Sequence, residues 1–342
     1  MAFWLDIAAF TVKALIIVAA LGGLALLIAR LARSSEPKDE EIKVRSLNER
    51  YDDMRDALNA ELLDKRQRKA FVKARKKEAK AAAKARRNQE PGKRVYVLAF
   101  KGDMRASAVK RLGSEIDAIL TVARPGTDEV VLRLQSPGGT VTGYGLAAAE
   151  ILRLRERKIK VTASVDQVAA SGGYMMASAA DRIVAAPFAV VGSIGVVAPA
   201  PNLHRLLKKN DIDYEEMTAG EFKRSVSVLG EITPAGREHF RGKLEDTHGA
   251  FKHFVQQCRP NVDIEQVANG DHWLASEALA LGLVDELSTG DEYLFRARDG
   301  ARLYEVSTAA RKTLVQQLLS GIGGAARAAA DFAATKLSAG GL

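Results

Sequence analysis

Ser171 lies where a pattern typical of a strand ends and a helical pattern begins. The run KIKVTASV, residues 158–165, predicts a strand, and residues 173–180 predict a helix that begins beside Gly172 and Gly173. Glycines allow a sharp turn, and the first N–H groups of a helix have no partner within it. A hydroxyl at such a corner suits a nucleophile that has hydrogen-bond donors beside it. For an isolated Ser-Gly-Gly, a structural turn is the favoured interpretation, and two further stretches of the chain change this.

A second corner of the same kind occurs earlier in the chain. VVLRL predicts a buried strand at residues 129–134, SPGG predicts a turn, and a helical pattern follows at residues 142–156. Gly138 and Gly139 would expose main-chain N–H groups there, which suits a second donor to an oxyanion. An ordinary strand–turn–helix junction explains the pattern as well.

Lys223 is the candidate proton acceptor, in the stretch TAGEFKRSVSVLGE, residues 218–231. A serine nucleophile needs a base, and a lysine that is removed from water near a second cation loses much of its proton affinity. Arg224 would be that cation. Most lysines are solvated surface groups, so Lys223 alone does not decide between the two interpretations.

Four motifs taken together carry a family resemblance. SPGG, VAASGGYMMA, VGSIGV and AGEFKR occur in this order and resemble the signal peptide peptidase SppA family, and most of all its membrane-bound SohB-type branch. The resemblance spans roughly residues 95–297 and the N-terminal apolar stretch. It implies a Ser–Lys dyad peptidase on an α/β fold, a ClpP/crotonase-like domain of repeated β-β-α units.

The resemblance also implies roles for individual residues. Ser171 corresponds to the nucleophile, Lys223 to the general base, and Ser193 to the hydroxyl that orients the lysine amine. Gly139 and Gly172 correspond to the oxyanion donors. Single-unit relatives are homo-oligomers in which the base can come from a neighbouring protomer, so we expect a homo-oligomer here.

Residues 7–29 are nearly all apolar and long enough to cross a bilayer. We expect an uncleaved, single-pass anchor in the inner (plasma) membrane, because no clear cleavage site precedes the basic residues that follow; a cleaved signal peptide is the alternative. Arg30 and Arg33 favour a cytoplasmic catalytic domain, whereas better-known SppA relatives place theirs on the outer side. The sequence leaves the topology open.

Two charged segments precede the main domain. Ser46 and Glu49 form a capping box for an amphipathic helix at residues 46–63. Residues 65–94 are mostly Lys, Arg and Ala and contribute much of the net charge of +9. They fit a solvated helix or tether, or a contact with anionic lipid. No nucleic acid is expected, because interleaved aromatic residues are absent.

The sequence therefore predicts four parts. Further strands are expected at residues 95–100, 160–165 and 182–185, and further helices at residues 106–123, 234–257 and 271–287, the last ending near Gly282 before a strand. Residues 183–200 carry no charge, but Pro187 and two glycines favour a buried strand and cleft wall over a second membrane span. The parts are a membrane anchor (1–32), a charged helical segment (33–94), the peptidase domain (95–300) and an Ala/Gly-rich tail (301–342).

Other chemistries remain open. A Ser-His-Asp triad would use Asp166 and one of five histidines, and geometry alone identifies such a triad. The histidines are His204, His239, His248, His253 and His272. We expect no cofactor and no metal, since no nucleotide or metal-ligand motif is present and Cys258 is the only cysteine.

Three functions follow from these patterns. The first is a serine endopeptidase that cleaves peptides or membrane-associated fragments such as remnant signal peptides. The others are a non-proteolytic membrane scaffold and an acyl-CoA enzyme on the same fold. The presence of both Ser171 and Lys223 favours the peptidase.

Overall fold

The computed structural model describes residues 40–88 and 92–310 together with Gly23. One compact unit, Lys43–Ser307, holds nearly all of these residues, and its fold is mixed α/β, as the sequence predicts. Apart from Gly23, the predicted anchor at residues 7–29 lies outside the described residues. Within the described part of the chain, no helix is both long and apolar enough to span a bilayer.

A seven-stranded sheet lies at the centre of the unit, in the order β1-β10-β2-β3-β4-β6-β9. The pairs from β10 to β9 are parallel, and one line of register joins Val97, Val131, Thr162 and Arg182. The four strands predicted from β-branched runs are confirmed. The strands are β1 (Glu40–Ser46), β2 (Arg94–Lys101), β3 (Glu129–Gln135), β4 (Lys160–Val165), β6 (Arg182–Ala185), β9 (Glu286–Leu287) and β10 (Arg302–Ala310).

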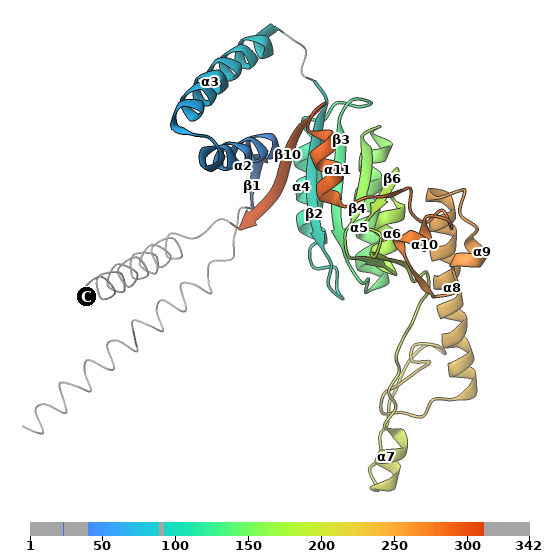
Figure 1. Cartoon of the computed structure of the whole chain (residues 1–342). Helices are drawn as coiled ribbons and strands as arrows, with labels where there is room; N and C mark the ends of the chain where they lie inside the picture. Colours follow the sequence, from blue (N-terminus) through green and yellow to red (C-terminus); the bar gives the residue numbers. More distant parts are fainter. Residues whose placement is uncertain (1–22, 24–39, 89–91, 311–342) are drawn as a thin grey trace, which may run out of the picture. The chain divides into compact units, whose positions relative to one another are not determined.

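Alternate side chains of β2 enter two different cores. Leu98 and Phe100 belong to the larger core, with helices α4 (Val109–Leu120), α5 (Val141–Glu156) and α6 (Gly172–Ser178). Val97 belongs to a smaller core with Leu294 of α11 (Gly290–Ala297). Figure 1 shows α11 on the opposite face of the sheet from α4 and α5. This alternation is the period of two that a strand covered on both faces requires.

The strand β10 lies beside β2, although the sequence analysis assigned residues from 301 onward to a tail. Leu303 is fully buried, Val306 is nearly so, and Asn48 accepts a hydrogen bond from the Leu303 N–H at 2.7 Å. The assignment of these residues changes because the pairing joins segments about two hundred positions apart, which a local pattern does not record.

A second, smaller sheet carries the corner at Ser171. Its strands are β5 (Val168–Ala170), β7 (Val190–Gly192) and β8 (His272–Leu274), with β7 in the middle. The helix predicted from residue 271 to near Gly282 is wrong at its start, where β8 lies, and only the short helix α10 (Ala275–Ala278) follows. The strand predicted after Gly282 is confirmed as β9. Pairing with the open edge of β7 outweighs the helical spacing of the apolar residues.

The remaining helices lie before and after these sheets. The predicted helix at 234–257 is confirmed as α8 (Pro234–Cys258), whose N-cap Thr233 accepts a hydrogen bond from the Gly236 N–H at 3.0 Å. Ser46 likewise caps α2 through the Glu49 N–H, at 3.3 Å. The others are α2 (Leu47–Leu62), α3 (Lys65–Asn88), α7 (His204–Lys209) and α9 (Ile264–Val267).

Candidate active site

Ser171 occupies a strained corner between β5 and α6. Its backbone has φ 52° and ψ −122°, a region that residues with a Cβ rarely adopt and that costs on the order of 1–3 kcal/mol. The corner is held by its N–H, which donates to the Gly192 carbonyl at 2.8 Å, and by its carbonyl, which accepts from Met175 at 3.0 Å. The predicted strand-to-helix corner is therefore present, and the surrounding hydrogen bonds maintain its conformation.

The SPGG loop packs directly against this corner. Gly138 has φ 90°, and a Cβ on it would lie 2.8 Å from both the Ser171 Cβ and the Gly172 nitrogen. Ser136 joins the loop to β5, because its N–H donates to the Val168 carbonyl at 2.8 Å and its carbonyl accepts from Ala170 at 3.0 Å. The two glycine-rich turns that lie far apart in sequence thus form one structure.

The N–H groups of Gly139 and Gly172 have no acceptor among the described residues. Gly172 is the first residue of α6, and the N–H of a first helical residue has no acceptor within its own helix. Both glycines line one pocket together with Ser171. By contrast, the Gly138 N–H is already occupied, since it donates to the Ser136 hydroxyl at 3.1 Å. Gly139 and Gly172 are therefore available as donors in the lining of the pocket that contains Ser171.

Tyr144 of α5 contacts both glycine-rich turns. Its hydroxyl donates to the Asp103 carbonyl at 2.8 Å and lies 2.6 Å from the Ser136 hydroxyl, so the Ser136 O–H donates to Tyr144. The side chain is fully buried, and this burial raises the pKa of Tyr144, which keeps the phenol protonated. The sequence analysis did not single out this residue.

Ser193 directly follows β7 and lines the same cleft as Ser171. It also has a positive φ, 54°, and its N–H donates to the Asp271 carbonyl at 2.6 Å. The structure thus brings together four of the five residues of the predicted site: Ser171, Ser193, Gly139 and Gly172.

Lys223 is absent from the residues that line the cleft. It lies on an exposed turn, where its N–H donates to the Gly220 carbonyl at 3.1 Å. On either side of it, Phe222 stacks on His239 with ring centroids 3.9 Å apart, and Arg224 pairs with Glu216 at 2.9 Å. Arg224 therefore has a carboxylate partner within this chain, and the expected cation beside the lysine is neutralised.

The cleft has two lobes that meet at Ser171. The larger lobe has a volume of about 810 Å³ and is partly polar, with Arg241, Glu245 and His248 from α8. The smaller lobe, of about 230 Å³, has mostly apolar walls. Those walls include Val141, Tyr144, Met175, Val197, Phe251 and Phe254. The contribution of α8 to this cleft was not predicted from the sequence, because only the tertiary fold shows which helix face covers the cleft.

The described contacts do not assemble the alternative triad. Asp166 accepts a hydrogen bond from the Gly290 N–H at 2.7 Å and pairs with Arg133 at 3.4 Å, and it is not in the lining of the cleft. His248 is the one histidine in that lining, and its Nε2 lies 3.2 Å from the Ile194 carbonyl. Among the described residues no carboxylate contacts His248, so a triad lacks its orienting acid.

Comparison with known proteins identifies the family of this chain. Models of "Peptidase family S49 N-terminal" and "Peptidase family S49" match residues 2–151 and 153–304. The "Probable protease SohB" of Haemophilus influenzae is 46% identical over 300 residues, which cover 85% of each chain. A protein of the same name from Buchnera aphidicola subsp. Schlechtendalia chinensis is 41% identical over 86% of this chain and 99% of the relative.

Among solved structures, a mutant of a membrane-bound stomatin-specific protease in complex with a substrate peptide is similar at 16% identity and a TM-score of 0.41, over 68% of this chain and 98% of that one. The family models and the sequence relatives together define a serine-type peptidase. The chain belongs to peptidase family S49, with SohB proteases among its relatives.

Proposed function

We propose that this chain is a membrane-anchored serine endopeptidase that uses Ser171 as nucleophile and Lys223 as general base. The observation that carries the proposal is the position of Ser171, on a strained corner in a cleft and beside the unpaired N–H groups of Gly139 and Gly172. Such preorganised donors are the main source of stabilisation for an acyl-transfer transition state.

The reaction follows from these positions. The Ser171 hydroxyl attacks the scissile carbonyl while neutral Lys223 accepts its proton, and the N–H groups of Gly139 and Gly172 bind the oxyanion. Protonated Lys223 then gives its proton to the leaving amine, and water hydrolyses the acyl-enzyme. Ser193, at the same cleft, orients the lysine amine as the family resemblance implies.

Lys223 reaches the cleft of a neighbouring copy in this proposal. The arm, residues 196–232, carries the lysine and exposes many large apolar side chains, of which Met217 is 91% exposed. The others are Val197, Leu203, Leu206, Ile212, Tyr214, Phe222 and Val228. Apolar surface of this kind is typical of a protein interface, which supports a homo-oligomer with a shared site.

The substrate is an extended peptide with a bulky apolar residue next to the scissile bond. The smaller lobe, at about 230 Å³, holds one apolar side chain, and the larger lobe holds the rest of the chain. Remnant signal peptides and fragments of membrane proteins have this composition. A single-pass anchor at residues 7–29, in the inner membrane, and a ClpP/crotonase-like domain of β-β-α units complete the proposal.

A serine-reactive activity probe tests the dyad on the full-length protein. Labelling of the wild type is expected, with loss in both Ser171→Ala and Lys223→Ala. Lys110→Ala, at an exposed lysine on α4, serves as the matched control and should keep full labelling. Loss in Ser171→Ala together with full labelling of Lys223→Ala would contradict a lysine base, and labelling that survives in Ser171→Ala would refute the nucleophile.

A further inference from the structure

The helix α3 carries a charge density that the peptidase chemistry does not use. Its 24 residues, Lys65–Asn88, contain twelve Lys or Arg and one acidic residue, Glu78. Asp64 begins the helix by accepting hydrogen bonds at 2.8 Å from the N–H groups of Arg66 and Gln67. At 1.5 Å per residue the helix extends for about 36 Å. The helix α3 therefore concentrates positive charge along a single long element.

The preceding helix α2 fixes the start of this rod to the peptidase domain. Asn48 donates to the carbonyls of Arg298 and Ala301, at 3.3 and 3.2 Å, and Tyr51 packs edge-on against Phe295 at 5.6 Å. Leu47 is 5% exposed, in the smaller core. The first turns of α2 are therefore packed against the peptidase domain.

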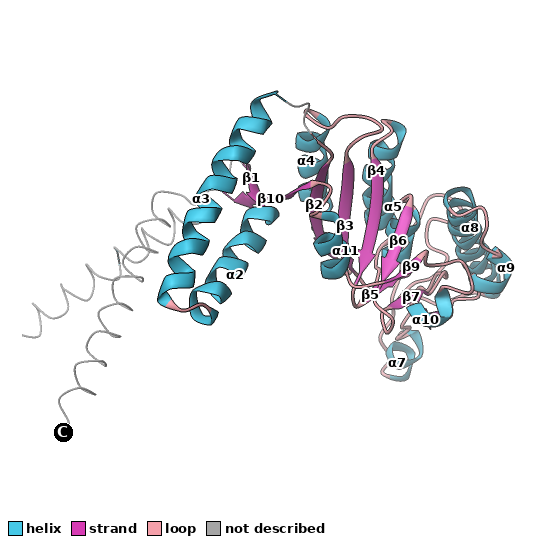
Figure 2. Cartoon of the chain, turned by 45° about the horizontal axis from the view of Figure 1, so that its top comes forward, coloured by secondary structure: helices cyan, strands magenta, loops and turns pink. Residues whose placement is uncertain are grey.

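Most of the basic side chains that the structure describes in α3 have no internal partner. Arg75 is the exception, since it pairs with Asp56 and Asp52 of α2 at 3.2 and 3.5 Å, and Figure 2 shows the two helices side by side. Among the side chains described in α3, seven others are exposed and form no ion pair. They are Lys65, Arg66, Arg68, Lys69, Lys73, Lys76 and Lys77. Arg75 thus helps to hold the helix pair together, and these seven cations face solvent.

We propose that α3 docks on the surface of an anionic phospholipid bilayer. Each basic residue near such a surface contributes about 1 kcal/mol, so several acting together give firm, salt-sensitive binding. This step rests on the proposed anchor at residues 7–29, which precedes α2 and α3 in the chain and would bring them to a membrane. Nucleic acid fits less well, because Phe71 is the one aromatic residue of α3 and base stacking needs several.

This inference goes beyond the proposed peptidase and is tested without measuring peptidase activity. Val72, 45% exposed on α3, is changed to Cys in a Cys258→Ser background, labelled with a fluorophore, and reconstituted as the full chain. Vesicles contain a headgroup quencher and either phosphatidylcholine alone or phosphatidylcholine with phosphatidylglycerol. We expect quenching only with phosphatidylglycerol, and its loss in concentrated salt.

Two fourfold variants provide the decisive comparison. Changing Lys69, Lys73, Lys76 and Lys77 to Gln should weaken the quenching about tenfold or more. Changing Lys110, Lys158, Lys209 and Lys243, which are exposed elsewhere, should leave it unchanged. Equal quenching in both kinds of vesicle, equal behaviour of both variants, or saturation by an oligonucleotide in place of vesicles would overturn the proposal. Flotation of the chain with vesicles reports on the residue 7–29 anchor separately.

Discussion

Tyr144 lies so close to Gly172 that a Cβ on this glycine would come within 2.4 Å of the tyrosine ring carbon Cγ. The same side chain is hydrogen-bonded to Ser136, which in turn accepts from the Gly138 N–H. One buried phenol therefore contacts the residue after Ser171 and also the loop that carries Gly139. The distance between the two proposed oxyanion donors depends on it.

Tyr144→Phe should lower kcat about tenfold and leave KM nearly unchanged. The Ser136 O–H would lose its buried acceptor, which also costs about 1–3 kcal/mol of unfolding free energy. Peptide hydrolysis and chemical unfolding of the variant measure both effects. Tyr96→Phe is the control, because Tyr96 is 5% exposed and its hydroxyl has no hydrogen bond within the described residues. Equal changes in kcat for the two variants would show that the Tyr144 hydroxyl has no special role.

Gly139→Ala should reduce acylation by about a hundredfold to a thousandfold. A Cβ at this position would lie 2.2 Å from the Met104 carbonyl oxygen, so the loop must shift and its free N–H moves with it. Loss of one oxyanion donor has an effect of this size in other serine hydrolases. The rate of labelling by a serine-reactive probe measures it, with circular dichroism to confirm folding.

Gly249→Ala is the matched control for that change. Gly249 lies within α8, and no atom comes within 4 Å of a Cβ built on it. This variant should keep its acylation rate and gain about 0.5–1 kcal/mol of stability, because alanine favours a helix. If a folded Gly139→Ala protein reacts as fast as this control, the Gly139 N–H is not an oxyanion donor.

The local sequence predicted the parts of the chain that local rules determine. Strand runs, the corner at Ser171 and the cap at Ser46 depend on residues a few positions apart. The covering of the cleft by Phe254 and His248 depends instead on how α8 packs, and β10 depends on pairing with a strand distant in sequence. Lys223 lies outside this cleft in the single chain, on the arm that we propose reaches a neighbouring copy.

Phe254→Ala should change substrate preference more than overall activity. Phe254 is a half-buried wall of the smaller lobe, so its loss removes contacts with a large apolar side chain beside the scissile bond. The value of kcat/KM should fall about tenfold to a hundredfold for peptides with Leu or Phe there, and little for those with Ala. Paired peptides that differ only at this position measure the ratio. An equal decrease for both peptides would argue against a specificity pocket.

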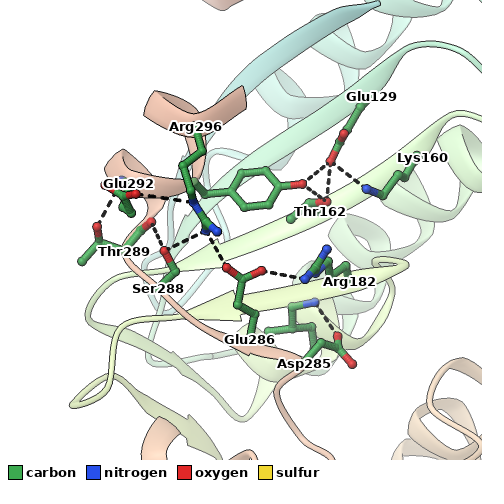
Figure 3. Close-up of polar contacts among 12 residues, drawn as sticks. Glu129, Lys160, Thr162, Arg182, Asp285, Glu286, Ser288, Thr289, Glu292 and Arg296 are labelled. Atoms are coloured by element: carbon green, nitrogen blue, oxygen red, sulfur yellow. Dashed lines mark hydrogen bonds and ion pairs between the residues drawn. The ribbon is translucent and has the colours of Figure 1, made fainter. Parts of the chain in front are cut away.

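Glu129→Gln should destabilise the protein at neutral pH and much less in acid. Glu129 is 2% exposed, and this burial raises its pKa, but hydrogen bonds from Lys93, Thr162 and Tyr293 outweigh the burial and lower the pKa from 4.5 to about 2. Figure 3 shows Thr162 and Lys160 beside the Glu129 carboxylate. A shift of this size corresponds to about 3 kcal/mol. Because the folded pKa is depressed, this stability is present above pH 4.5 and is lost as the pH falls towards 2.

Unfolding by urea between pH 7 and pH 3 checks this expectation. The difference in unfolding free energy between wild type and Glu129→Gln should narrow as the pH falls. Glu292→Gln is the control, since the Glu292 side chain is 55% exposed and its ion pair with Arg296 is worth little. A difference that stays constant over the whole range would mean that the carboxylate charge of Glu129 does not stabilise the fold.

Mixing two inactive variants should restore peptidase activity if Lys223 acts across an interface. Ser171→Ala keeps the base and Lys223→Ala keeps the nucleophile, so a mixed oligomer contains some sites with both. The two proteins are dissociated, mixed, reassembled and assayed on one peptide. Ser171→Ala mixed with the double variant Ser171→Ala/Lys223→Ala is the control and should stay inactive.

A change at the exposed Met217 of the arm varies assembly independently of the dyad. Met217→Glu should abolish the restored activity together with oligomer formation. If mixed oligomers are shown to form but stay inactive, the base must act within the same chain as its serine.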